Sequence, residues 1–301
     1  MNEIFRNVFG GFALLLAAAG ALAQNATNPG SNPGSDRGLQ TPRLYVLEGG
    51  VLESDPTRYR LTADDVQETQ LSVAAYLIVH PRGVLLWDAG GIADSERISA
   101  AGGVQQRVVR ADGGERFVTL GPSLESQITS AGYAPSAVTH MAFSHYHWDH
   151  TANANAFAHA TWLVRAIERD VMFGTEPPGA ARPATYAALR NVSPVLVATE
   201  QHDVFGDGTV VLLHTPGHSE GHQALYVKLA RTGGVVLSGD LYHYPEERSL
   251  NRLPTFEVDQ QATAEARRAL ETFLTRMDAT LWIQHDLVAH RKLKKAPEYY
   301  D

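Results

Sequence analysis

The chain has 301 residues, of which 44% are hydrophobic and 19% charged. That is enough for one large α/β domain or for two small ones. The formal charge of −8 argues against a protein that binds nucleic acid over its surface. The sequence has no cysteine, which excludes disulfides and leaves only nitrogen and oxygen ligands for any metal.

The first residues are typical of an export signal. Arg6 precedes the apolar run VFGGFALLLAAAGALA, and Ala21-Leu22-Ala23 fits an A-x-A cleavage site before Gln24. The apolar run is shorter than the ~20 residues that a membrane-spanning helix needs. We therefore expect residues 1–23 to be a cleaved signal peptide, with no stable membrane insertion afterwards. The mature chain is expected to be periplasmic or secreted.

Residues 24–40 have the composition of a flexible linker. In QNATNPGSNPGSDRGLQ, Asn, Gly, Pro and Ser dominate, and almost nothing apolar is available for burial. After this stretch the pattern changes to short apolar runs broken by turns. We therefore expect one folded domain over residues 41–301.

The apolar runs of this domain predict strands. YLIVHPRGVLLWDAG, residues 76–90, predicts two strands joined by a Pro-Arg-Gly turn, with Asp88 ending the second. The runs AVTHMAFSH, TVVLLHTPGH, GGVVLSGD and ATLWIQHD each end in a His or an Asp. A helix is predicted to begin near Asp259, with one apolar face made of Ala266, Ala269, Leu270, Phe273, Leu274 and Met277. Strands alternating with helices, many of the strands in hairpins, predict an α/β fold with sheets between helix layers.

Metal-ligand residue types gather at the ends of these strands. In the loop SHYHWDH, His145 and His147 alternate, so an extended backbone points both side chains to one side. Asp149 and His150 follow where the chain turns, and would face a neighbouring position. The later strands contribute His218, Asp240 and His285. Seven such groups are too many for one tetrahedral zinc and suit two metals about 3.5–4 Å apart.

These motifs carry a family resemblance. HYHWDH is similar to the H-x-H-x-D-H signature of the metallo-β-lactamase superfamily, and TPGHSEGH, LSGDLYHYPEE and LWIQHD resemble its remaining ligand segments. The resemblance runs from about Leu44 to the end of the chain. It implies an αββα sandwich of two mixed β-sheets flanked by helices. It also implies a first metal held by His145, His147 and His218, a second held by Asp149, His150 and His285, and Asp240 bridging the two.

Within the superfamily the chain resembles the N-acyl-homoserine lactonases, the quorum-quenching enzymes, in RLYVLEGG, YLIVHPRGVLLWDAG, SHYHWDH and SGDLYHYPEE. The resemblance implies hydrolysis of an acyl-lactone ester by a hydroxide bridging two divalent ions. Zinc is expected first, with iron, cobalt or manganese left open. Asp149 or Asp240 would relay a proton to the leaving alkoxide. The small-molecule lactone is the expected partner, without nucleic acid, and a homodimer is left open.

One position departs from the lactonase pattern. These lactonases generally carry a tyrosine three residues after the bridging aspartate, but this chain has His243 there, between Tyr242 and Tyr244. Either a shifted tyrosine, Tyr242 in particular, or His243 itself would assist the carbonyl or leaving oxygen.

Other residues are open to two interpretations. Tyr146 and Trp148 would either line an acyl-chain pocket or anchor the loop in the core. His222 would either orient a metal ligand or serve in packing, and Asp88 is expected to support the site or form a turn. A structural role is expected for the remaining histidines: His80, His140, His159, His202, His214 and His290.

The competing functions are other hydrolases on the same scaffold: a β-lactamase, a thioesterase or a phosphotriesterase-like enzyme. Asp240 argues against the β-lactamase, because true β-lactamases lack the bridging carboxylate. A glyoxalase-type thioesterase would carry a basic site for the substrate carboxylate, and the sequence shows no such site. A secreted metal-binding protein without turnover is the alternative from another class.

Overall fold

The computed structural model describes residues 39–301. The expected signal peptide, and the linker apart from Leu39 and Gln40, lie outside the described residues. Leu39 differs from the expected linker: its side chain is buried in the hydrophobic core, so the packed domain begins two residues before the predicted boundary. Among the described residues, no helix is long and apolar enough to cross a membrane.

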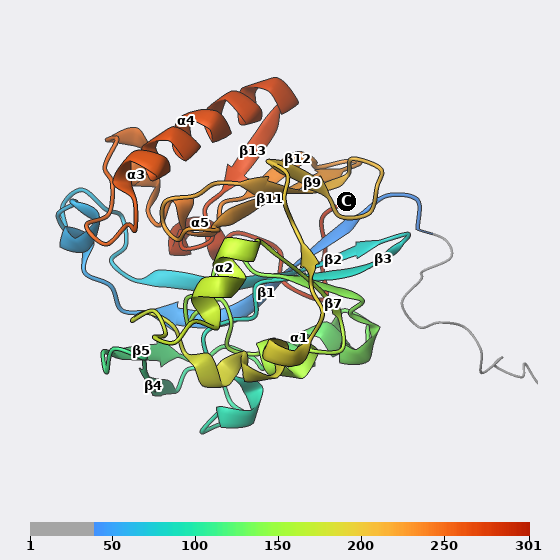
Figure 1. Cartoon of the computed structure of the whole chain (residues 1–301), viewed down its shortest axis with the longest axis horizontal. Coiled ribbons are helices and arrows are strands. Elements are labelled where there is room, and N and C mark those ends of the chain that lie inside the picture. The colour runs from blue at the N-terminus through green and yellow to red at the C-terminus, as the bar shows by residue number, and fades with distance from the viewer. Residues whose placement is uncertain (1–38) are drawn as a thin grey trace, which may run out of the picture. The chain divides into compact units, whose positions relative to one another are not determined.

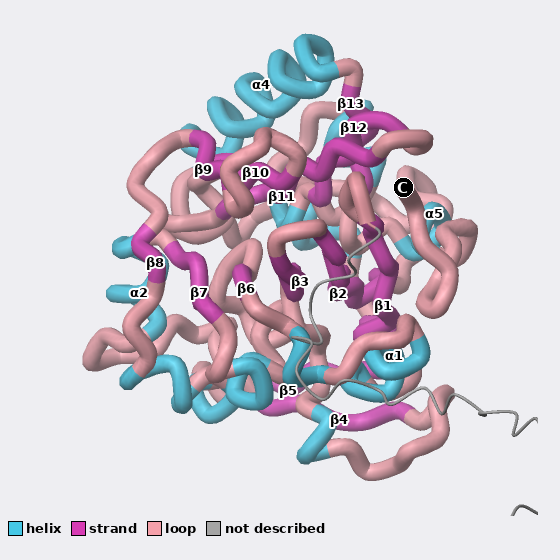
Figure 2. The backbone as a smooth tube through the Cα atoms, turned by 90° about the vertical axis from the view of Figure 1, so that its right-hand side faces the viewer, coloured by secondary structure: helices cyan, strands magenta, loops and turns pink. Residues whose placement is uncertain are grey.

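The chain forms two mixed β-sheets. The larger has the strand order β4-β5-β1-β2-β3-β6-β7-β8 and the smaller the order β13-β12-β11-β10-β9 (Figure 2). The strands of the first are β1 (Arg43–Leu52), β2 (Leu71–His80), β3 (Gly83–Trp87), β4 (Gln105–Val109), β5 (Glu115–Thr119), β6 (His140–Ala142), β7 (Thr161–Val164) and β8 (Val195–Leu196). Those of the second are β9 (Gln201–Asp203), β10 (Val210–His214), β11 (Gln223–Leu229), β12 (Gly233–Leu237) and β13 (Ala279–Trp282).

Helices cover the outer faces of both sheets (Figure 1). α1 (Leu124–Ser130) and α2 (Ala166–Met172) pack through Leu124, Ile128 and Met172 into the core on the first sheet. α4 (Gln260–Met277) packs on the second sheet. The shorter α3 (Pro245–Ser249) and α5 (Leu287–His290) follow β12 and β13. The predicted sandwich of two mixed sheets between helix layers is confirmed.

Side-chain alternation explains the layers. Tyr76 and Ile78 of β2 point into the core between the sheets, where they meet residues such as Leu225 and Val235, whereas Ala75 and Leu77 point into the core under α1. All ten residues of β2 are buried, as expected for a central strand covered on both faces. The predicted 76–90 hairpin is present, with Tyr76 opposite Trp87.

Helix α4 begins where the sequence predicts. The Asp259 side chain accepts hydrogen bonds from the backbone N–H groups of Gln261 and Ala262, which caps the first turn. Four of the six predicted apolar residues form its buried face: Ala266, Leu270, Phe273 and Leu274. Ala269 and Met277 are exposed instead, so the predicted face is too wide at these two positions.

Candidate active site

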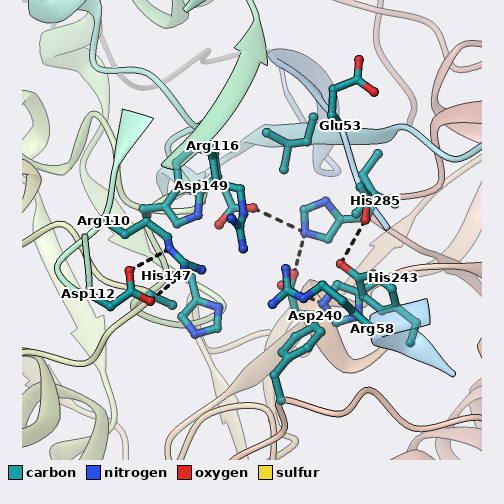
Figure 3. Close-up of a pocket in the computed structure, with 17 residues that line it drawn as sticks. Glu53, Arg58, Arg110, Asp112, Arg116, His147, Asp149, Asp240, His243 and His285 are labelled. Carbon is teal, nitrogen blue, oxygen red and sulfur yellow. Dashed lines mark hydrogen bonds and ion pairs between the residues drawn. The ribbon is translucent and has the colours of Figure 1, made fainter. Parts of the chain in front are cut away.

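Four strand ends deliver polar side chains to one place. The loop after β6 carries His145, His147, Asp149 and His150, while His218, Asp240 and His285 follow β10, β12 and β13. Figure 3 shows His147, Asp149 and His285 lying together around Asp240. Rigid strands can place side chains accurately, which is why a site at their ends can hold a defined geometry.

The seven predicted ligands form two groups that share one carboxylate. Potential ligand atoms of His145, His147, His218 and Asp240 lie within 4.8 Å of one another, and so do those of Asp149, His150 and His285. Oδ1 of Asp240 lies 3.0 Å from Nε2 of both His150 and His285. Oδ2 of Asp240 lies 3.6 Å from Nε2 of His145 and 3.4 Å from Nε2 of His218. Each oxygen of Asp240 therefore faces a different group, which is the arrangement a bridging ligand requires.

Unpaired atoms in this cluster fit two cations. Nε2 of His145 is buried without a hydrogen-bond partner, and Nε2 of His150 and Oδ1 of Asp240 form no well-oriented hydrogen bond although they lie 3.0 Å apart. A buried polar atom left unpaired costs about 1–3 kcal/mol. Nδ1 of His147 and Nε2 of His218 also face each other at 3.1 Å. Cations between these atoms would satisfy them all, and the nitrogen and oxygen donors suit zinc and other first-row divalent metals.

Outer partners turn the histidine rings toward the centre. Nδ1 of His150 lies 2.9 Å from Oδ2 of Asp88, and Nδ1 of His218 lies 3.0 Å from Oε1 of Glu257. When Nδ1 carries the proton and donates it outward, Nε2 is left as the metal ligand. Of the two roles expected for Asp88, this contact corresponds to support of the site. Glu257 has no motif around it, so no signal in the sequence pointed to it.

His285 is oriented by the backbone. Its Nδ1 lies 2.6 Å from the carbonyl oxygen of Ser72, in β2. The neighbouring Asp286 does not support His285: its carboxylate accepts a hydrogen bond from the backbone N–H of Ala289 and caps α5. A backbone acceptor leaves no trace in side-chain identity, so no sequence signal points to Ser72.

His222 holds the backbone of the bridging aspartate. Its Nε2 accepts a hydrogen bond from the N–H of Asp240 at 3.0 Å, and its Nδ1 lies 2.9 Å from the carbonyl oxygen of Thr215. Burial lowers the pKa of His222 to about 3, so the ring stays neutral and keeps its acceptor. Gly239 makes this approach feasible, because a Cβ there would lie 2.7 Å from Nε2 of His222 and its φ is +53°.

The electrostatics of the cluster favour an ionised bridge. Burial alone would raise the pKa of the Asp240 carboxyl, but His150, His285 and the other nearby histidines outweigh it and hold that pKa well below its usual range. Burial and neighbouring histidines lower the pKa of both His145 and His147 well below the ordinary value. His150 and His218 behave differently: burial lowers the pKa of each ring, but the nearby carboxylates outweigh burial and raise the pKa of His150 well above its ordinary value and that of His218 to about 10. Binding of a metal by these two rings would therefore release protons.

The residues after Asp240 separate into two roles. His243 stays at the site: its Nε2 lies 3.1 Å from Oδ2 of Asp240, and its ring stacks on His285 at 5.4 Å. Tyr242 points the other way. Its hydroxyl donates to Oε1 of Glu271 at 3.3 Å, on α4. The structure therefore contradicts the expectation that Tyr242 reaches the reacting groups.

Of the other aromatic residues near the motifs, some line the cavity and others lie away from it. Tyr244 donates its hydroxyl to the carbonyl oxygen of Thr69, away from the ligands. Tyr146 is buried in the core under the first sheet, whereas Trp148 is buried but lines the cavity over the site. Tyr59, which the sequence did not single out, packs its ring 4.7 Å from that of His243.

A cavity of about 270 Å³ opens onto the cluster. Its apolar lining consists of Leu52, Tyr59, Leu71, Trp148 and Phe256, and its floor includes His147, Asp149, Asp240, His243 and His285. Three arginines also line it: Arg58, Arg110 and Arg116 (Figure 3). No motif in the sequence pointed to these arginines. None of the six histidines expected to be structural lines this cavity.

Comparison with curated proteins identifies relatives over most of the chain. The N-acyl homoserine lactonase AttM of Azorhizobium caulinodans is 28% identical over 272 residues, covering 86% of this chain and 98% of the relative. An N-acyl homoserine lactonase of Bacillus cereus is 24% identical over 268 residues, covering 87% of this chain and 100% of the relative.

Solved structures share the fold. A crystal structure of a Bacillus thuringiensis AiiA variant, with N-decanoyl-L-homoserine bound at its active site, matches with a TM-score of 0.68 at 21% identity. That match covers 87% of this chain and 100% of the other. AidC, a dizinc quorum-quenching lactonase, matches with a TM-score of 0.60 at 15% identity, covering 90% and 98%.

The family model gives the assignment. The model described as the metallo-beta-lactamase superfamily matches residues 69–281, a range that contains six of the seven clustered ligand candidates; His285 lies four residues beyond it. The chain belongs to the metallo-beta-lactamase superfamily, and its relatives across most of its length are N-acyl homoserine lactonases.

Proposed function

We propose that this chain is a dinuclear metal-dependent hydrolase that opens the lactone ring of N-acyl-homoserine lactones. The observation that carries the proposal is Asp240, whose two oxygens face two separate ligand groups on the floor of a cavity. The similarity to lactonases over 86% of the chain supports the choice of substrate. In another structure with the same fold, the product N-hexanoyl-L-homoserine is bound at the catalytic metal centre.

The reaction adds water across the ring ester. The carbonyl carbon gains a hydroxyl group, the bond to the ring oxygen breaks, and that oxygen leaves as an alcohol after taking a proton. When bound, two divalent ions, zinc first among the candidates, would supply a water nucleophile near neutral pH and polarise the carbonyl. The chain's own side chains must then orient the ester and move the proton.

We assign the proton relay to Asp149. Its side chain lines the cavity, with its carboxylate oxygens 4.0 Å from Nε2 of His150 and 3.9 Å from Nε2 of His285. Asp240 is less suited to this role, because the histidines around it hold its pKa well below the usual range and make it a poor proton carrier.

We assign His243 the hydrogen bond to the carbonyl or leaving oxygen. It lines the cavity at the position where the related lactonases generally have a tyrosine. Burial lowers the pKa of His243, but the carboxylates of Asp240 and Glu247 outweigh it and raise that pKa above the ordinary value. This shift favours the protonated ring, in which both nitrogens are hydrogen-bond donors.

The test is hydrolysis of a medium-chain acyl-homoserine lactone by the purified mature chain, followed as acid release with and without a chelator. A β-lactam and an aryl ester are run in parallel. We expect lactone opening that the chelator and His145→Ala both abolish, while His159→Ala, at an exposed histidine, retains it. Cleavage of the β-lactam or the aryl ester, with the lactone left intact, would show that the substrate is wrong.

We also propose that the chain is exported, on the basis of the apolar run and the A-x-A site before Gln24. Fractionation of expressing cells, followed by N-terminal sequencing, tests this proposal. A product in the periplasm or medium that begins near Gln24 supports it, and an intact chain in the cytoplasm contradicts it.

A further inference from the structure

The three arginines of the cavity come from two segments that are far apart in sequence. Arg58 lies in the short 3₁₀ helix Pro56–Tyr59, whereas Arg110 and Arg116 come from the β4–β5 hairpin. All three side chains are half-buried and line the same cavity as Asp149 and the other floor residues (Figure 3).

Only one of these arginines has a carboxylate partner. Arg110 pairs with Asp112 through Nη2–Oδ2 at 2.6 Å and Nε–Oδ1 at 3.2 Å. Arg116 donates from Nη1 to the backbone oxygen of Glu115 at 2.8 Å, and the Arg58 guanidinium lies 4.6 Å from the centre of the Phe256 ring. Among residues 39–301, neither Arg58 nor Arg116 forms an ion pair.

Apart from Asp112, the acidic residues that line the cavity form no ion pair with an arginine of this cluster. Glu53 is exposed and accepts a hydrogen bond from the Gln70 side chain at 2.7 Å. Asp149 and Asp240 face the histidines of the ligand cluster. Burial and the like charges of Arg110 and Arg58 lower the pKa of Arg116, and the Asp149 carboxylate opposes this shift.

Such a cluster is suited to an anionic ligand. A guanidinium group presents a planar fork of N–H donors that matches a carboxylate, and charge-assisted hydrogen bonds are about twice as strong as neutral ones. A neutral acyl chain would leave both free guanidinium groups uncompensated. At about 270 Å³, the cavity is also slightly below the ~300–1,000 Å³ of most ligand pockets, which favours a short acyl group.

We propose that Arg58 and Arg116 select a lactone whose short acyl group carries a terminal carboxylate, so that the metal cluster engages the ester and the arginines engage the distal anion. This inference rests on the proposed lactonase function and narrows its substrate class. Arg116 is the main contact, because it lines the cavity near Asp149 and the ligand cluster (Figure 3), and Arg58 completes the anion site. Both are specificity residues and take no part in the chemistry.

The experiment compares two lactones of equal acyl length with the metal-loaded full-length mature protein. One carries a hexanoyl group, and the other carries the adipoyl group with its free terminal carboxylate. We expect kcat/KM to favour the adipoyl lactone at least about tenfold, in line with a charge-assisted contact. Raising the salt from about 0.05 to 0.5 M should reduce this preference, because salt screens partly exposed charges.

Variants test whether the arginines cause the preference. In Arg116→Gln and in the double variant with Arg58→Gln, the ratio of the two kcat/KM values should fall toward one. Arg107→Gln is the matched control: Arg107 lies in the same hairpin, but it is exposed and paired with Glu115 outside the cavity. Melting curves establish that each variant is folded, and the salt dependence of the unmodified protein needs no variant.

The outcomes are distinct. Equal or better turnover of the hexanoyl lactone, unchanged in Arg116→Gln, overturns the inference and leaves the lactonase proposal intact. If neither lactone opens, inhibition of aryl-ester hydrolysis by adipate is compared with inhibition by hexanoate. A preference for adipate that Arg116→Gln removes would support the anion site while the lactonase proposal fails. Equal inhibition would overturn both.

Discussion

Glu168 joins the two loops that carry the first ligand group, and its replacement should loosen both. The side chain is buried in α2. Oε1 accepts a hydrogen bond from the backbone N–H of Tyr146, between His145 and His147, at 2.8 Å. Oε2 accepts one from the N–H of Gly221 at 2.8 Å, and the Ser219 hydroxyl donates to both oxygens.

Glu168→Gln keeps the shape but replaces one acceptor with a donor. Whichever way the amide is turned, its NH₂ group meets a backbone N–H, that of Tyr146 or that of Gly221. One buried N–H is then unpaired, at a cost of about 1–3 kcal/mol. For a domain of this size, 1 kcal/mol corresponds to roughly 2–4 °C in Tm. A loss of about 2 kcal/mol should therefore lower Tm by roughly 4–8 °C.

Differential scanning calorimetry at fixed zinc concentration measures this effect. Burial raises the pKa of Glu168 to about 7, so the comparison is made near pH 8, where the carboxylate is mainly ionised. Asp170→Asn is the control, because Asp170 lies on the same helix but is exposed. Equal Tm values for Glu168→Gln and Asp170→Asn would refute the reasoning.

Three further predictions concern the neighbourhood of the site and the core. His243→Phe should lower kcat for lactone opening about 10²-fold, the scale of a lost oxyanion donor, whereas Tyr242→Phe should stay within about twofold because its hydroxyl only meets Glu271; equal losses in steady-state kinetics would contradict this. Gly239→Ala should reduce bound zinc and lower Tm, because an alanine at this positive φ is strained by about 1–3 kcal/mol. A normal zinc content in this variant would contradict the prediction. Burial lowers the pKa of His290 to about 3. The unfolded chain therefore binds a proton at this residue near pH 6.5, whereas the folded chain does not, and the folded state loses stability as the pH falls below about 6.5. Urea unfolding at about pH 7 and 5.5 should show a smaller loss for His290→Gln, by up to about 1.4 kcal/mol per pH unit, and an identical loss would exclude this role.

The strand ends were predictable because hydrophobic periodicity and ligand spacing are local signals. The runs that carry His145, His218, Asp240 and His285 each contain a strand, and these four residues meet at one site. Packing of α4 was likewise predictable from its apolar face. The exposure of Ala269 and Met277 was not, because helical periodicity alone does not show how wide the buried face is.

The direction of Tyr242 and His243 depended on backbone detail. The chain after β12 passes through Gly239 at φ +53° and a short 3₁₀ turn, Gly239–Leu241. This turn sends Tyr242 toward α4 and His243 into the cavity. Consecutive residues on an irregular segment follow neither the helix nor the strand period, so sequence spacing could not choose between them.

The cavity position of Arg110 and Arg116 could not be predicted from the sequence, because it depends on strand pairing between residues far apart in the chain. The β4–β5 hairpin is polar and largely exposed, and by itself it resembles an ordinary surface hairpin. Only the pairing of Val51 and Leu52 with Thr119 and Val118 brings it beside β1 and the cavity. The sequence interpretation, which found no basic substrate site, therefore did not identify the three arginines that line the cavity.

The central claim is that catalysis needs both halves of the shared cluster. Zinc is titrated into the metal-free mature chain, and lactone opening is recorded at each addition together with bound zinc. We expect activity to rise until two zinc ions are bound per chain. We also expect Asp240→Asn, which weakens the bridge between the two groups, to lower both zinc content and activity. Full activity with one bound ion, or lactone opening by the metal-free chain, would contradict the claim.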